Sequence, residues 1–120
     1  MQKDLFGAKD VVSIARSNGD LFSLEFIEWL PDNLHVWRAF ERETFSVIKR
    51  GFKHYSSYAI IEFIRHHTMI HEAAPTFKLN NNHRPYLPRL FDLLHPDHAG
   101  LFEYRTTTKP KGNDFYDLRA

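Results

Sequence analysis

Apolar residues recur every three to four positions in four stretches of the chain, which is the spacing of one face of an α-helix. The pattern predicts helices over residues 21–30, 33–50, 56–71 and from 84–86 to 95. The apolar positions of the four stretches are, in order, Phe22, Phe26, Trp29 and Leu30; Trp37, Phe40, Val47 and Ile48, with Thr44 among them; Ile60, Ile61, Ile64 and Thr68; and Leu87, Leu90, Phe91 and Leu94. We expect these side chains, aromatic ones included, to form the core.

The ends of the predicted helices carry residues that stop or cap helices. Pro31 follows the first helix and lacks a backbone N–H, so the helix should end there. Gly51 follows the second helix, at the position where glycine commonly adopts the left-handed conformation that ends a helix. Ser56 or Ser57 can cap the third helix, because a serine hydroxyl accepts a hydrogen bond from an N–H of the first turn.

Two other segments bear on the fold class. Residues 101–108 alternate between apolar and polar, with Phe102 and Tyr104 on one side, which is typical of a half-buried strand that could pair with residues 77–79. Residues 11–14 fit either a short strand or the start of a helix. The predicted fold class is mainly α, with about four helices and a small two-stranded β element. A winged-helix or helix-turn-helix-like arrangement is one form of it.

The length and composition indicate an ordinary globular protein. A chain of 120 residues is expected to form a single domain, 1–120. We expect residues 1–10 to be a mobile N-terminal peptide and residues 109–120 to be a loose tail. The chain has no cysteine, which excludes a disulfide framework and a thiol nucleophile and suits a reducing cytoplasm. No apolar run approaches the roughly 20 residues that a membrane span needs, so we expect no membrane partner.

Positive charge is concentrated in the middle of the chain. Residues 46–90 hold seven Lys and Arg against two Glu, although the formal net charge of the whole chain is only +1. A basic middle between acidic flanks indicates an anionic partner such as DNA. A mixed, solvated surface with an accidental imbalance explains the same counts equally well.

The two helices 33–50 and 56–71, joined by a short turn with Gly51, have the outline of a helix-turn-helix. In that arrangement the second helix would meet base edges and phosphates of DNA. A plain antiparallel helical hairpin is the alternative. The residues that we expect to contact nucleic acid are Lys49, Arg50, Lys53, Ser57, Arg65, Arg84 and Arg89.

The chain offers little for metal binding or catalysis. His67 and His71 are four residues apart on one predicted helix face, and His95 and His98 are three apart, as two ligands of one metal need to be. All-histidine structural sites are unusual, and no H-E-x-x-H motif is present. Since nucleotide-binding and nucleophile motifs are also missing, we expect no catalytic residue, no metal, no cofactor and no small-molecule substrate.

The N-terminal residues Gln2-Lys3-Asp4-Leu5-Phe6 resemble the Q-x-x-L-F peptide with which bacterial replication and repair proteins bind the β sliding clamp. In such a peptide Leu5 and Phe6 enter a hydrophobic pocket, and the Gln2 amide both donates and accepts hydrogen bonds. The resemblance implies a partner on replicating DNA. The alternative is that Leu5 and Phe6 pack on the protein's own surface.

A longer part of the chain resembles small uncharacterised proteins encoded by phages and prophages. The resemblance is carried by Phe40-Glu41-Arg42-Glu43, His54-Tyr55-Ser56-Ser57, Ile64-Arg65-His66-His67-Thr68, Phe77-Lys78-Leu79-Asn80-Asn81-Asn82, and Leu90-Phe91 followed by His95-Pro96. The family pattern often has Trp where His66 stands, so that aromatic position differs here. The resemblance implies the cytoplasm of a bacterial host but no activity. We weigh three functions. The first is a DNA-binding accessory protein recruited by the clamp peptide, and the second is an inhibitor of a host protein such as the clamp or a defence complex, without DNA contact. A metal-dependent enzyme that uses the histidine cluster is the last.

The clamp hypothesis predicts the behaviour of one variant. Replacing Leu5 and Phe6 together by alanine should abolish binding to a β clamp, because the two side chains supply most of the buried apolar area, at about 25 cal/mol per Å². The melting temperature should not change, since the peptide lies at the end of the chain. Calorimetry with the full-length protein tests this; no binding at tens of micromolar, or a much lower melting temperature of the variant, would contradict it.

Overall fold

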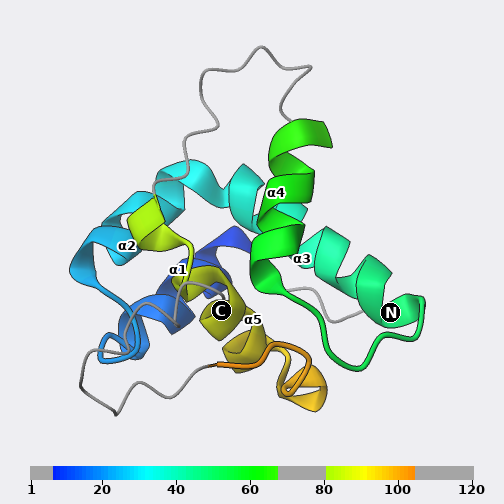
Figure 1. Cartoon of the computed structure of the whole chain (residues 1–120). Coiled ribbons are helices and arrows are strands. Elements are labelled where there is room, and N and C mark those ends of the chain that lie inside the picture. Colours follow the sequence, from blue (N-terminus) through cyan, green and yellow to red (C-terminus); the bar gives the residue numbers. More distant parts are fainter. Residues whose placement is uncertain (1–6, 68–80, 105–120) are drawn as a thin grey trace, which may run out of the picture.

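The computed structural model describes residues 7–67 and 81–104, and these residues form helices joined by short connections (Figure 1). The α-helices are α1 (Ala8–Ser17), α2 (Leu24–Trp29), α3 (Leu34–Lys49), α4 (Ser57–His67) and α5 (Tyr86–Leu94), and the 3-10 turns are η1 (Leu30–Asn33), η3 (Asn81–His83) and η4 (Pro96–His98). The prediction of a mainly helical protein is confirmed. The segment 11–14 lies within α1, which begins at Ala8, so residues 8–10 are helical and not part of a terminal peptide.

The helix ends follow the local sequence. The α-helix that precedes Pro31 ends at Trp29, and the proline begins a 3-10 turn, where its missing N–H leaves no bond unmade. Gly51 has φ +95° and ends α3 as predicted, with its N–H donating to the carbonyl oxygen of Ile48 at 2.9 Å. Ser56 is the residue that caps α4, since its Oγ accepts from the N–H of Ala59 at 3.2 Å.

The predicted two-stranded β element is wrong. Residues 101–104 form a bend without strand structure, and the remainder of the predicted pair, 77–79 and 105–108, lies outside the described residues. The alternation fails because Leu101 and Phe102 are buried one after the other, at 5% and 4% exposure, whereas Tyr104 is 43% exposed. An extended strand would turn two successive side chains to opposite faces.

The winged-helix or helix-turn-helix-like arrangement is also wrong. The described residues contain no strand that would make a wing. In addition, residues 50–56 separate α3 from α4, which is longer than the three to four residues typical of a helix-turn-helix. The two helices pack against each other.

The core is assembled around α3, the longest helix, which contacts η1, α4 and α5 (Figure 1). α1 packs on α2 and η1 at one end of this arrangement. The fully buried large side chains are Trp37, Phe26, Phe40, Phe91, Leu30, Ile60, Ile61, Ile64, Leu87, Leu90, Val11 and Val36. The aromatic stripe predicted from the sequence is therefore core, with Trp29 only partly buried at its edge.

A buried polar pair joins α3 to the residue that follows α5. Nε2 of His95 lies 2.7 Å from Oε2 of Glu41, and the two side chains are only 7% and 8% exposed. The other oxygen of Glu41 accepts a hydrogen bond from Arg38 at 2.9 Å. The His95 ring packs on Phe45 and Phe91, with ring centroids 4.8 Å away in both cases. Since a carboxylate left alone in such surroundings is costly, the pair fixes how α5 sits on α3.

The contact between Glu41 and His95 predicts that substitutions of the two residues lower the stability non-additively. His95→Phe and Glu41→Leu should each lower the free energy of unfolding by about 3 kcal/mol, because each deprives a buried polar group of the hydrogen bond between Nε2 of His95 and Oε2 of Glu41. The double variant removes both polar groups and should lose less than the sum of the single losses. Urea unfolding of the four proteins measures this, and strictly additive losses would contradict it.

Candidate nucleic-acid interface

Three of the predicted nucleic-acid contacts come together in the connection after α3. Residues 49–54, which we name the basic turn, consist of Lys49, Arg50, Gly51, Phe52, Lys53 and His54, and all six are exposed. The chain makes this turn at the right-hand edge of the molecule in Figure 1, before it enters α4. The sequence therefore places three cations and a histidine on one outward-facing segment.

Backbone hydrogen bonds give the basic turn a defined shape. The N–H of Phe52 donates back to the carbonyl oxygen of Val47 at 3.4 Å, beside the Gly51 bond, so the end of α3 is closed. On the other side of the turn, the N–H of Tyr55 donates to the carbonyl oxygen of Leu101 at 3.0 Å. The turn is thus held at both ends, and residues 52–54 project between the two attachments.

Phe52 is a functional candidate that the sequence reasoning missed. Its ring is 47% exposed, with one edge against Tyr55 at 5.1 Å between centroids and the Arg50 guanidinium 5.7 Å from its centre. An aromatic ring beside cations is the combination that holds a base and its phosphate in single-stranded nucleic acid. The available signal was a phenylalanine outside both apolar stripes, flanked by Arg50 and Lys53.

The three cations Lys49, Arg50 and Lys53 of the basic turn are not neutralised by the part of the chain that the structure describes. Lys49, Arg50 and Lys53 form no ion pair with any residue in the described ranges. His54 lies 3.1 Å from Glu103, but both side chains are largely exposed, at 66% and 72%. Such a solvated pair contributes little and separates easily. The turn therefore presents positive charge to the solvent.

Arg65 and Arg84 lie in different surroundings. Both point at Glu62, with guanidinium nitrogens 3.1 Å and 3.8 Å from its Oε2. The Arg84 guanidinium also covers the ring of Tyr58, 4.4 Å from its centre. One carboxylate thus offsets part of the charge of two arginines, so these residues are weaker candidates for phosphate contacts than their charges suggest.

The remaining predicted contacts are scattered. Ser57 begins α4 and is only 7% exposed, so its hydroxyl is not open to a phosphate. Arg89 lies on α5 with its guanidinium 5.5 Å from the centre of the Tyr86 ring, on a different element from the basic turn. The clamp-binding residues Gln2, Leu5 and Phe6 lie outside the described residues.

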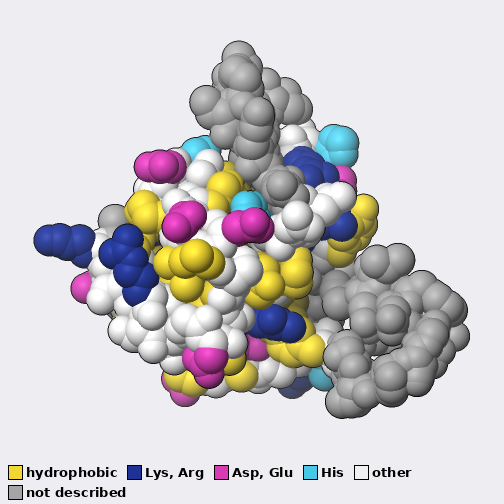
Figure 2. All heavy atoms as spheres, turned by 90° about the vertical axis from the view of Figure 1, so that its left-hand side faces the viewer, with side chains coloured by type: hydrophobic (Ala, Val, Ile, Leu, Met, Phe, Trp, Pro, Cys, Tyr) yellow, Lys and Arg dark blue, Asp and Glu magenta, His cyan; other side chains and the backbone are white. Residues whose placement is uncertain are grey.

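The side of the molecule that carries α2 has a different character. Hydrophobic and acidic side chains lie next to one another over the middle of this face (Figure 2). Leu24 is 67% exposed and Leu21 is 41% exposed, and Asp20, Glu25 and Glu28 are exposed around them. The uneven charge of the sequence is thus also uneven in space, with the basic turn and α2 at opposite sides of Figure 1.

His83 is the histidine with the most unusual surroundings. It is 7% exposed, its ring lies 4.8 Å from that of Trp29, and its Nδ1 has no hydrogen-bond partner among the described residues. Burial lowers the pKa of His83 below its ordinary value of 6.5, and the negative charge of Glu25 opposes that effect only in part. The ring is therefore a neutral packing element at physiological pH.

Asp92 and Tyr104 form the other perturbed pair. Burial raises the pKa of Asp92, although the hydroxyl of Tyr104 donates to its Oδ2 at 2.8 Å, which acts in the opposite direction. Burial and the contact with Asp92 raise the pKa of Tyr104, which stays protonated. The pair ties the end of the described chain to α5.

Neither a metal-binding cluster nor a helix suited to crossing a membrane is found in the described ranges. No group of three or more His, Asp or Glu side chains converges there as metal ligands would. His95 faces Glu41, while His71 and the side chain of His67 lie outside what the structure describes. No described helix has both the length and the apolar character needed to cross a membrane.

Comparisons with known proteins found no relative of this chain. No protein-family model matches the chain, and neither a curated protein nor a solved structure is significantly similar to it.

The burial of His83 predicts a specific pH dependence. The unfolded chain binds a proton at this ring near pH 6.5, whereas the folded protein binds it only at lower pH, so stability should fall as the pH decreases below about 6.5. His83→Phe keeps the packing on Trp29 and removes the titration. Melting curves at pH 7.5 and 5.0 should show a smaller loss for the variant, and equal losses would contradict the assignment.

Proposed function

We propose that the protein is a small nucleic-acid-binding accessory protein whose contact surface is the basic turn. The observation that carries the proposal is the exposure of Lys49, Arg50 and Lys53, unpaired within the described residues, around an exposed Phe52 ring. Lysine and arginine side chains bind phosphates, and an exposed aromatic ring stacks on an unpaired base. Together they favour a single-stranded or locally opened strand over intact duplex DNA.

The end of a helix explains only part of this charge. Lys49 and Arg50 lie at the C-terminus of α3, where cations stabilise the helix dipole, so their presence has a purely structural explanation. Lys53 lies beyond the helix and does not act on that dipole. Phe52 is 47% exposed although its side chain is large and apolar. These two residues are the ones that a structural role leaves unexplained.

Recruitment through the N-terminal peptide completes the proposal. Gln2, Leu5 and Phe6 would bind a β sliding clamp and bring the basic turn to replicating DNA in the cytoplasm of a bacterial host. The sequence of residues 2–6 and its likeness to clamp-binding peptides support this part of the proposal.

The test is a salt titration with fluorescently labelled oligonucleotides. Single-stranded DNA should bind with an affinity whose logarithm falls linearly with the logarithm of salt concentration, by about 0.7 per neutralised phosphate. The variant Arg50→Gln/Lys53→Gln should reduce that slope by about 1.4 for the two lost contacts. Lys9→Gln/Arg16→Gln, which removes the same charge from α1, is the matched control and should leave the slope unchanged.

Variants of Phe52 distinguish the contribution of base stacking from that of charge in the same assay. Phe52→Ala should weaken binding to single-stranded DNA by about 1–3 kcal/mol and leave the salt slope unchanged, whereas Phe52→Trp should retain the affinity. Absence of binding to any DNA at about 50 mM salt would overturn the proposal, because the electrostatic contribution is near its strongest there. Equal effects of the two charge variants would show that the basic turn is not the contact surface.

The second candidate function is a protein-binding inhibitor of a host machine, such as the clamp or a defence complex, without DNA contact. The observation that favours it is the α2 face, where Leu21 and Leu24 are exposed among acidic side chains. Exposed apolar groups rimmed by charge are typical of protein–protein contact surfaces. A protein that binds no DNA but retains a host protein through Leu21 and Leu24 would establish this function instead.

A further inference from the structure

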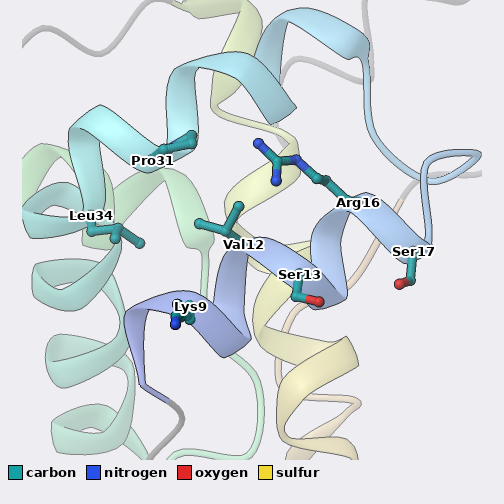
Figure 3. A pocket seen from close by; sticks show the side chains of 7 residues that line it. All are labelled: Lys9, Val12, Ser13, Arg16, Ser17, Pro31 and Leu34. Atoms are coloured by element: carbon teal, nitrogen blue, oxygen red, sulfur yellow. The ribbon is translucent and has the colours of Figure 1, made fainter.

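A groove runs between α1 and the start of α3, on a part of the surface separate from the basic turn. It has a volume of about 530 Å³ and is lined by Lys9, Val12, Ser13, Arg16, Ser17, Pro31 and Leu34. Figure 3 shows Val12 on α1 facing Leu34 and Pro31 across the opening, with Lys9 and Arg16 towards its two ends. The groove thus has an apolar centre between two cations.

The charge of the groove is of one sign. No acidic residue lines it, and Lys9 and Arg16 form no ion pair with any residue in the described ranges. Lys9, Val12 and Arg16 follow one another at intervals of three and four residues, so they share one face of α1. Val12 and Leu34 are both partly exposed, which leaves apolar surface uncovered between the two charges.

The spacing of Lys9 and Arg16 suits a helical peptide as the occupant of the groove. Lys9 and Arg16 are seven residues apart on α1, which corresponds to about 10 Å along the helix axis. A second helix with acidic residues at positions i and i+7 repeats that distance on one face. Leucines at i+3 and i+4 of the same helix lie between the acids and would meet Val12, Pro31 and Leu34.

We propose that this groove binds an acidic amphipathic helix of a partner protein, with two carboxylates on Lys9 and Arg16 and an apolar side chain between them. Complementary charge orients such a helix, and the apolar centre supplies the burial. A nucleic-acid strand fits less well, because its phosphates gain nothing from Val12, Pro31 and Leu34 and the groove offers no aromatic ring for a base. The inference stands whether or not the basic turn binds nucleic acid.

The probe is a synthetic 18-residue alanine-rich helix with Glu at i and i+7 and Leu at i+3 and i+4, titrated into the full-length ¹⁵N-labelled protein. We expect the largest amide shifts in residues 9–17 and 32–35, and a dissociation constant in the micromolar to millimolar range. Lys9→Gln/Arg16→Gln should raise that constant about tenfold by removing two charge contacts. The matched control Arg50→Gln/Lys53→Gln should bind the probe like the wild type.

Two further probes separate charge from burial. A peptide with Gln in place of both Glu, and a peptide with Ser in place of both Leu, should each bind at least several-fold more weakly, since each lacks one half of the recognition. Shifts that fall outside the groove, or equal binding of all three peptides, would overturn the proposal. It would also be overturned if Lys9→Gln/Arg16→Gln reduced DNA binding as strongly as the basic-turn variant, since the groove would then be part of a nucleic-acid surface.

Discussion

The contact between Glu41 and His95 is the point on which the rest of the structure depends. It brings a polar group of the central helix α3 to the residue that follows α5, inside a shell of aromatic rings. Two backbone hydrogen bonds connect His95 to the residues that follow it. The N–H of His98 donates to the carbonyl oxygen of His95, and the N–H of Leu101 donates to the carbonyl oxygen of His98. The carbonyl oxygen of Leu101 in turn accepts a hydrogen bond from the N–H of Tyr55, the residue that directly follows the basic turn. The buried pair is thus connected through backbone hydrogen bonds to the exposed basic turn.

The positive charges of this chain differ in what they can do. Arg65 and Arg84 share the carboxylate of Glu62, and Arg84 is further engaged with Tyr58. Lys49, Arg50 and Lys53 of the basic turn have no such partner within the described residues, and the attachments at both ends of the turn hold it in place. A preformed, exposed set of cations loses less conformational entropy on binding than a set that must first leave its own ion pairs. For this reason the proposed contact surface is the short turn and not the whole basic middle of the sequence.

Two cationic surfaces with different centres imply two different kinds of partner. The basic turn surrounds an aromatic ring, which suits an unpaired base, whereas the groove on α1 surrounds Val12 and Leu34, which suit aliphatic side chains of a protein. The two proposals therefore assign a nucleic acid to the basic turn and a second protein to the groove on α1.

Local sequence was sufficient for α2, α3, α4 and α5 and for most of their ends, whereas it left residues 11–14 of α1 open between a strand and a helix. The apolar spacing around Trp37 and Phe40 identified α3, and Gly51 identified its end, because both signals act within a few residues of the chain. The segment 101–104 was misread as a strand because its alternation of residue types is also local, while its actual conformation is set by Leu101 and Phe102 packing together against distant helices. The Glu41–His95 pair and the sharing of Glu62 by two arginines had no sequence signal, since they join residues that only folding brings within reach. Residue type and spacing therefore determined which segments are helical and which cations exist, and long-range packing decided which of those cations remain available to a partner.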